Sequence, residues 1–230
     1  MSAGIDTTTF EAIVRQAQRA PTAHNTQPAL FRLNNPREIA ILGDARRALS
    51  VSDPSRRDYL MGLGAVAEGV RLALAERAIA ARIESMSNTG DAPVSGDHRC
   101  VARVLIDGAC EPDPLGSQVA HRRSYRGSFA KLSAERANAA RQRLDDIPGA
   151  VLVTDQLTIA ALTNHYEAAN LSSLRDPAFV GELWHWLRLN PHHANYDRDG
   201  LNADCMAMSG IERRLAGLVM RPAVLPRLLR

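Results

Sequence analysis

A long apolar helix interrupted by glycines places the strongest constraint on how this chain folds. The stretch "DYLMGLGAVAEGVRLAL", residues 58–74, carries apolar side chains at helical spacing. They form one stripe of Leu60, Leu63, Ala67, Val70 and Leu74. Each glycine in a helix costs about 1 kcal/mol relative to alanine, so we expect Gly62, Gly64 and Gly69 to allow close packing against another backbone. Asp53 or Ser55 is the expected N-terminal cap, and the helix is expected to be central and buried.

Short strands and helices alternate along the rest of the chain. The first helix is expected over Thr7–Ala20, where Pro21 ends it. Strands are predicted for "ALFRL", "EIAIL", "ARIESM", "CVARVLID" and, as a buried strand, "GAVLVTD". Further helices are predicted for residues 114–121, 133–146, 156–175, 177–189 and 211–220, with 190–204 irregular. This order predicts an α+β fold, with a mixed or antiparallel sheet flanked by helices.

Composition and charge argue against several classes of protein. The formal net charge is +3 and the arginines are interleaved with Asp and Glu, so we expect no nucleic-acid partner. The most apolar stretch, residues 60–67, is far too short to span a membrane, and no segment resembles a signal peptide. The three cysteines are widely spaced and odd in number, which fits a reducing compartment. We therefore expect a cytoplasmic protein without a membrane partner.

Two short motifs carry the chemistry. The first, "APTAHNTQP", spans residues 20–28 and presents several hydrogen-bonding side chains between two prolines. The second, "HRRSYRGSF", spans residues 121–129 and places three arginines within five positions around Ser124. Guanidinium groups offer forked N–H donors that suit phosphate. A polar connector and a solvated turn remain the plain alternatives for these two stretches.

Together the motifs resemble those of the nitroreductase family. The first is similar to the family's flavin-contacting loop, A-P-S/T-x-x-N-x-Q-P, and the second is similar to its R-x-S-x-R motif, which holds the FMN phosphate. Ordinary nitroreductases carry the arginine motif first, whereas here the loop comes first. This order resembles the fused (Acg-type) subfamily, in which one chain forms a pseudo-dimer around one flavin site. In two places the chain departs from the pattern, with Ala29 for the common Trp and Gly69 for Asn.

The resemblance implies a nitroreductase-like fold made of two related halves. Residues 1–114 would form the first half with the flavin-ring loop. Residues 115–230 would form the second half, with the arginine motif and a helical cap that includes "ELWHWLRL". Fused members continue beyond the point that corresponds to "RPAVLPRLLR", so the second half is expected to be incomplete.

The resemblance also implies the site and the activity. Arg122 and Arg126 would pair with phosphate oxygens and Ser124 would add a hydroxyl donor, while the loop would contact the flavin ring. The implied cofactor-binding residues are Pro21, Thr22, Ala23, Asn25, Gln27, Arg122, Arg123, Ser124 and Arg126. The flavin carries the reaction, so no catalytic side chain is expected. The implied activity is FMN-dependent, NAD(P)H-driven reduction of nitroaromatics or quinones by ping-pong hydride transfer, with a homodimer as an expected assembly.

Two other functions remain open at this stage. The aromatic segment Phe179–Leu189 favours a protein that binds or sequesters flavin without turnover, and a degenerate protein without cofactor is the other alternative. "GLGAVAEG" lies inside a helix rather than after a strand, which argues against a dinucleotide-binding motif. The histidines at 185, 192 and 193 and Cys205 show no metal-ligand spacing, so no metal is expected.

Overall fold

The computed structural model describes residues 4–86, 96–127, 129–130, 133–145 and 147–230. The chain divides into two compact units. The first contains the residues up to Tyr125 together with His185–Met208, and the second contains Arg126–Trp184 and Ser209–Arg230.

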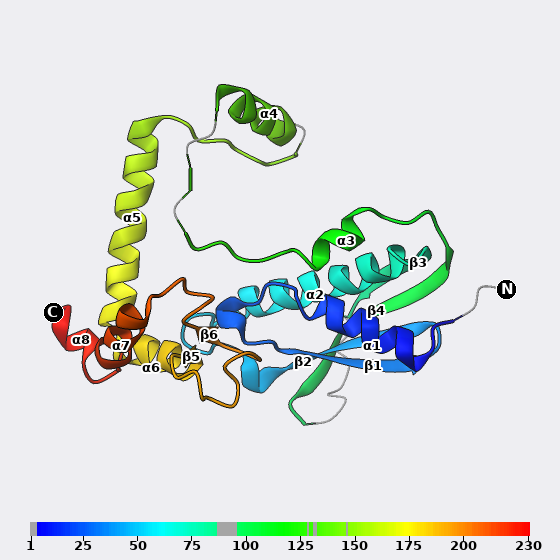
Figure 1. Cartoon of the computed structure of the whole chain (residues 1–230), viewed down its shortest axis with the longest axis horizontal. Coiled ribbons are helices and arrows are strands. Elements are labelled where there is room, and N and C mark those ends of the chain that lie inside the picture. The colour runs from blue at the N-terminus through cyan, green and yellow to red at the C-terminus, as the bar shows by residue number, and fades with distance from the viewer. Residues whose placement is uncertain (1–3, 87–95, 128, 131–132, 146) are drawn as a thin grey trace. The chain divides into compact units, whose positions relative to one another are not determined.

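The first unit is built on a four-stranded antiparallel sheet (Figure 1). Its strand order is β1-β2-β4-β3. The strands are β1 (Ala29–Asn35), β2 (Glu38–Asp44), β3 (Ile79–Ser85) and β4 (His98–Ala109). All four were predicted from the sequence, and the α+β class with an antiparallel sheet and helices is confirmed. Residues 39–44 of β2 are all buried, and Ile39 and Ile41 belong to the core cluster that includes side chains of α1 and α2.

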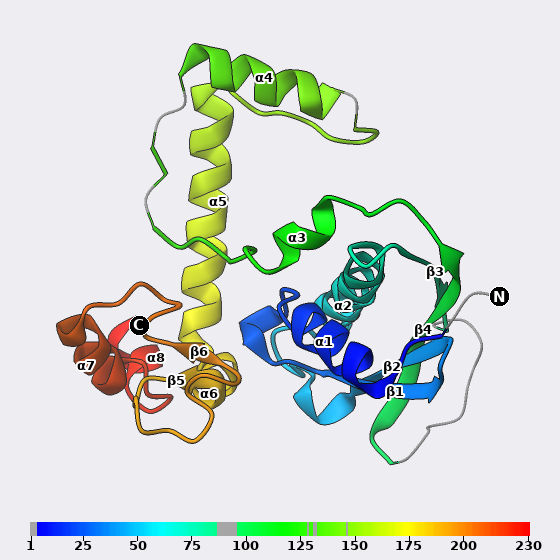
Figure 2. The same ribbon diagram turned by 45° about the vertical axis from the view of Figure 1, so that its right-hand side comes forward.

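Helices α1 (Thr7–Ala17) and α2 (Arg57–Ala75) cover one face of this sheet (Figures 1 and 2). A Cβ on Gly69 would lie 3.3 Å from Ala17 Cα, so glycine lets the two helices approach closely. Gly62 plays the same part against Thr22, whereas a Cβ on Gly64 would meet open space. The packing role predicted for the glycines is therefore confirmed for two of the three.

The ends of α1 and α2 differ slightly from the predicted ones. Helix α1 stops at Ala17 instead of Ala20 because the last turn tightens, with Arg19 N donating to Gln16 O and Ala20 N donating to Ala17 O. Arg56 occupies the N-cap position of α2 and makes no side-chain capping bond. Asp53, one of the two predicted caps, bonds the first turn from three residues upstream, since its carboxylate accepts from Tyr59 N at 2.9 Å.

Just beyond the end of α2, Ala78 adopts a left-handed backbone conformation that is unfavourable for alanine. It has φ 58° and its N–H donates to Ala75 O, the left-handed geometry in which helices usually place glycine. Because an alanine there costs roughly 1 kcal/mol or more, Ala78→Gly is expected to raise the free energy of unfolding by about 1 kcal/mol. Urea denaturation measures this, and an unchanged or lower midpoint would contradict it.

Among its described residues, the second unit has helices as its regular secondary structure, joined by loops. It contains α4 (Ala134–Asp145), α5 (Gln156–Arg175), most of α6 (Pro177–Trp186), α7 (Gly210–Val219) and the short α8 (Leu225–Leu228). Helices α4 to α7 were predicted, whereas α8 was not. In α7, Ser209 and Glu212 form a reciprocal capping box.

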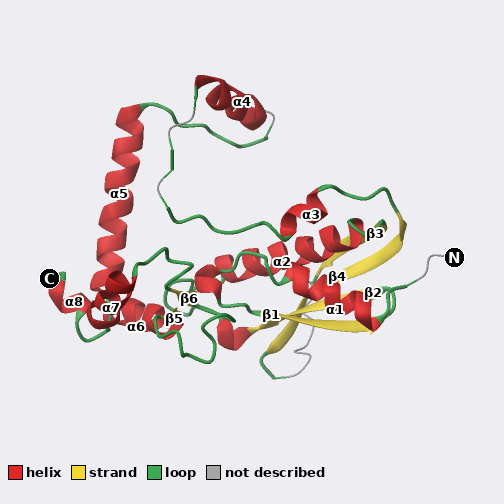
Figure 3. Ribbon diagram, in the orientation of Figure 1, coloured by secondary structure: helices red, strands yellow, loops and turns green. Residues whose placement is uncertain are grey.

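The buried strand predicted for residues 149–155 is wrong. These residues, all of them described, form a loop between α4 and α5 (Figure 3). Val151 is 85% exposed. The described part of this unit offers no second strand, so the segment has no ladder partner for its N–H and C=O groups. Apolar β-branched residues alone do not make a strand.

None of the helices in the described part of the chain is both long enough and apolar enough to cross a membrane.

Candidate functional site

The first motif forms a tight loop at the end of α1 with an unusual backbone. Residues 23–25 make a single 3-10 turn. His24, Asn25 and Gln27 all have positive φ, at 47°, 52° and 51°. Side chains with a Cβ rarely adopt this conformation, and such residues gather where surrounding structure holds a functional loop in place.

Hydrogen bonds inside the loop fix its shape. Gln27 N donates to Thr22 Oγ1 at 3.2 Å, and Gln27 Nε2 donates to Asn25 Oδ1 at 2.7 Å. Thr26 is buried, and its N–H donates to Ala23 O. Two of the side chains implied to touch the flavin, Asn25 and Gln27, are thus bonded to each other, while Pro21 is exposed and Thr22 and Ala23 are half-buried.

A distant segment of the same unit is bonded to this loop. Gly200 N donates to Asn25 O at 2.9 Å, and Asn25 Nδ2 donates back to Gly200 O at 3.0 Å. Arg47 Nη1 donates to Thr26 O at 2.8 Å and to Asp199 Oδ2 at 3.0 Å. The loop is therefore fixed by hydrogen bonds from Arg47, which follows β2, and from Gly200, which follows Asp199.

Asp199 is the centre of this network. It is 5% exposed, and its Oδ1 accepts from both Nε and Nη2 of the equally buried Arg188, at 3.0 and 2.7 Å. Asn195 Nδ2 donates to Oδ2 at 3.2 Å. A carboxylate this far from water needs such partners, because an uncompensated buried charge is costly.

Two very short parallel strands support the same segment. They are β5 (Leu187–Arg188) and β6 (Leu201–Asn202), neither of which was predicted. A Cβ on Gly200 would overlap Trp186 O, and the φ of Gly200 is 76°. Only glycine fits there, which brings the chain close enough for its backbone to reach Asn25.

The second motif begins beside the first. Arg122 Nε donates to Arg19 O at 2.8 Å, and Arg19 Nη1 donates to Ala120 O at 2.9 Å. These reciprocal bonds join residues more than a hundred positions apart in sequence. The residue before the flavin-like loop and the first arginine of the phosphate-like motif are therefore neighbours.

Helix α3 (Leu115–Val119) brings the arginine motif to this place. Gly116 packs on α2, where a Cβ would lie 2.6 Å from Glu76 Cβ and 2.8 Å from Leu72 O. Gln16 of α1 donates to Gly116 O at 2.9 Å. The position of the motif thus depends on a glycine that lets α3 sit against both other helices.

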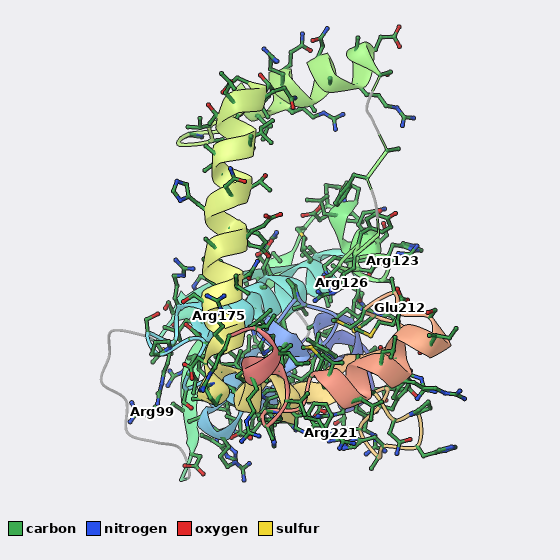
Figure 4. The ribbon with its side chains drawn as sticks, turned by 90° about the vertical axis from the view of Figure 1, so that its left-hand side faces the viewer. Arg99, Arg123, Arg126, Arg175, Glu212 and Arg221 are labelled. Atoms are coloured by element: carbon green, nitrogen blue, oxygen red, sulfur yellow. The ribbon has the colours of Figure 1, made fainter. Side chains whose placement is uncertain are left out.

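The residues of the second motif that were predicted to hold a cofactor are open to solvent. Arg122, Arg123, Ser124 and Arg126 are all exposed, and Arg123 and Arg126 can be followed in Figure 4. No carboxylate of the described residues forms an ion pair with any of the three arginines. Their forked N–H donors suit an anion such as phosphate. The roles of individual residues in holding a cofactor stay predictions.

A hollow of about 600 Å³ adjoins the clamped loop in the first unit. Arg46, Arg47 and Arg188 line it together with Asp44 and Asp199. Arg46 donates two side-chain hydrogen bonds to Asp44, and this contact holds the pKa of Asp44 below its ordinary value. The basic groups here are therefore largely neutralised by their own acidic partners.

Sequence reasoning missed Arg47, Arg188 and Asp199 as part of this site. The segment 190–204 was predicted only as irregular. The sequence "NYDRDGLNAD" offered one signal, because it places aspartates and an arginine directly before Gly200. Asp and Gly together are typical of a turn. Among the described residues no group of three metal-binding side chains is found.

Asp53 lines a small pocket beside Thr22, Ala23 and Thr26 of the loop, and its removal is expected to lower stability. It is 6% exposed; burial opposes its ionisation, but N–H groups of Tyr59, Asp58 and Arg57 outweigh this and lower its pKa from 3.8. Asp53→Ala is expected to cost about 1–2 kcal/mol of unfolding free energy at pH 7 through loss of the cap.

The pH dependence of that loss follows from the sign of the shift. A carboxyl with a depressed folded pKa stabilises the protein above its unfolded pKa, and this contribution disappears as the pH falls through the folded pKa. The difference between wild type and Asp53→Ala should therefore shrink below about pH 3.8. Denaturant titrations at several pH values measure it. Asp58→Ala, at an exposed carboxylate on the same turn, is the control, and an equal loss there would contradict the capping role.

Comparison with known proteins gives a partial sequence match. No protein-family model matches the chain. It is 33% identical over 87 residues to "Putative NAD(P)H nitroreductase acg" of Mycobacterium tuberculosis, in strains CDC 1551 / Oshkosh and ATCC 25618 / H37Rv. The match covers 38% of this chain and only 26% of those relatives.

Solved structures give a weaker likeness. The chain resembles a crystal structure titled as a putative NADH oxidase from Clostridium acetobutylicum, with 16% identity and a TM-score of 0.39 over 59% of this chain and 89% of that one. A nitroreductase family protein from Clostridium difficile 630 gives 15% identity and 0.39, covering 56% and 89%. One from Streptococcus pneumoniae TIGR4 gives 16% and 0.35, covering 57% and 88%. TM-scores this low do not establish a shared fold.

Proposed function

We propose that this chain is an FMN-binding oxidoreductase of the nitroreductase type, in which both motifs serve one flavin site. NAD(P)H would be the electron donor, and a nitroaromatic or a quinone the acceptor. One observation carries the proposal: Arg122 and Arg19 exchange hydrogen bonds, so the arginine motif starts where the flavin-like loop starts. The partial similarity to a nitroreductase supports the same reading.

The residues present fit the chemistry of FMN. The group has an anionic phosphate, for which Arg122, Arg123 and Arg126 supply exposed guanidinium donors and Ser124 a hydroxyl. The bond from Arg122 Nε to Arg19 O orients that guanidinium and leaves its forked Nη groups for the phosphate. The clamped loop offers Thr22 and the Asn25–Gln27 pair as polar groups of fixed geometry.

When bound, FMN would accept a hydride from the nicotinamide and deliver electrons to the acceptor. The chain's own residues would bind and orient it. Arg47 and Asp199 would act as positioning residues, because they hold the loop through Thr26 O without belonging to either motif.

A second candidate, flavin binding without turnover, has one observation in its favour. Gly200 is hydrogen-bonded to both the backbone oxygen and the side-chain amide of Asn25. The chain itself therefore already covers part of the polar edge of the loop. Such cover would limit the approach of a nicotinamide.

The two candidates differ in one experiment. The FMN-loaded protein is mixed with NADH or NADPH without oxygen, and the flavin absorbance near about 450 nm is followed. Bleaching that a quinone then reverses is expected for the oxidoreductase. A flavin that stays bound and oxidised would contradict it and would leave the binding protein as the function.

A further inference from the structure

A second pocket lies in the first unit, away from both motifs. It encloses about 460 Å³ between the N-terminal half of α2 and the strands β2, β3 and β4. Its walls are mostly apolar, with Leu60, Leu63 and Ala67 of α2 facing Ile83 and Val101. Ligand sites commonly have volumes of about 300–1,000 Å³ and walls of this kind. No described residue of the loop 20–28 or of the arginine motif lines it.

An irregularity in the sheet shapes one wall. Along β2 and β4 the pairing passes from Ile41–Ala102 to Leu42–Cys100, which leaves Val101 as an extra residue. A regular strand turns successive side chains to opposite faces, yet Cys100, Val101 and Ala102 all line the pocket. Bulges of this kind redirect side chains beside functional sites.

Ser85, Tyr59 and two arginines are the polar side chains among the apolar ones. Arg56 and Arg99 line the pocket, both exposed, and Arg99 can be seen extending from the start of β4 in Figure 4. Within the described residues neither arginine forms an ion pair with a carboxylate. Arg56 has φ 58° at the N-terminus of α2, a conformation that an arginine adopts only at a cost.

Tyr59 also lines the pocket, and it stays a hydrogen-bond donor. Burial and the nearby charge of Asp44 raise the pKa of its phenol, although Arg56 and Arg99 oppose this. The phenol is therefore neutral at physiological pH and carries its proton. Its oxygen lies too close to Gly43 for a Cβ to be added there, so a glycine in β2 makes room for it.

We propose that this pocket binds a small apolar molecule that bears one carboxylate. The apolar body would fill the space between α2 and the bulged β4. The carboxylate would pair with Arg56 and Arg99 at the rim, where both guanidinium groups lack an acidic partner among the described residues. This is a different site from the one proposed for FMN, and neither proposal depends on the other.

Gly64 provides a way to fill the pocket without breaking the fold. It lines the pocket, and a Cβ added there would meet no atom within 4 Å. Replacing a helical glycine also removes its conformational cost, so Gly64→Leu is expected to keep or raise the melting temperature. Gly217→Leu in α7 is the matched control, since a Cβ at Gly217 also meets open space.

The test is calorimetric titration of the whole chain with decanoate, without added flavin. Wild type and Gly217→Leu are expected to bind it alike, and Gly64→Leu to lose binding. The double variant Arg56→Ala, Arg99→Ala should bind at least about tenfold more weakly. Decanol, which lacks the charge, should bind wild type and the double variant equally.

Several results would overturn the proposal. They are no binding of decanoate to wild type, unchanged affinity in folded Gly64→Leu, or unchanged affinity in the double arginine variant. Displacement of decanoate by FMN would also overturn it, because the pocket would then be part of the flavin site.

Discussion

Replacing Asp199 by alanine is expected to lower the free energy of unfolding by about 3–5 kcal/mol, as removal of one partner from a buried ion pair commonly does. Asp199 accepts two bonds from Arg188 and one from Arg47. Without the carboxylate, the Arg188 guanidinium, which is almost fully buried, has lost its counter-charge. Urea denaturation of wild type and variant gives the difference.

The control is Asp197→Ala, at an exposed aspartate two residues away. It is expected to change stability by less than about 0.5 kcal/mol. Equal effects at the two positions would contradict the central role of Asp199. Where Asp199→Ala remains folded, its FMN affinity should also fall, because Arg47, which bonds Thr26 O, loses the carboxylate that anchors it.

The double variant Arg122→Ala, Arg126→Ala is expected to weaken FMN binding by about a hundredfold or more, since each charge-assisted bond contributes about 1.5–3 kcal/mol. Both side chains are exposed, so their loss should leave the folded state intact. Fluorescence titration with FMN measures the dissociation constant.

A second double variant, Arg141→Ala, Arg143→Ala, removes the same charge from exposed positions of α4. It is expected to bind FMN as wild type does. If both double variants lose affinity equally, the effect is one of net charge, and Arg122 and Arg126 are not a phosphate site.

Local sequence patterns predict most of the first unit well. The four strands and the buried stripe of Leu63, Ala67, Val70 and Leu74 follow from periodicity, because a one-sided core requires it. Leu60, predicted in the same stripe, is instead 47% exposed. Close packing accounts for Gly69, where two helices touch, but not for Gly64, which opens onto a pocket. A glycine pattern does not distinguish close packing from empty space.

The candidate site is only partly visible in the sequence. Its two motifs can be recognised, but the clamp cannot, since Arg47, Arg188 and Asp199 come from three separate stretches. The strand predicted for 149–155 is wrong for a related reason: pairing depends on a neighbour that local sequence does not reveal. Local sequence patterns do not predict polar contacts between residues that are distant in the sequence.

Flavin retention tests the central claim most directly. The purified protein is incubated with excess FMN, desalted, and its visible spectrum is recorded. Absorbance bands near about 370 and 450 nm that stay with the protein are expected of a bound oxidised flavin. A folded, colourless protein after desalting would contradict the claim that the two motifs form a flavin site.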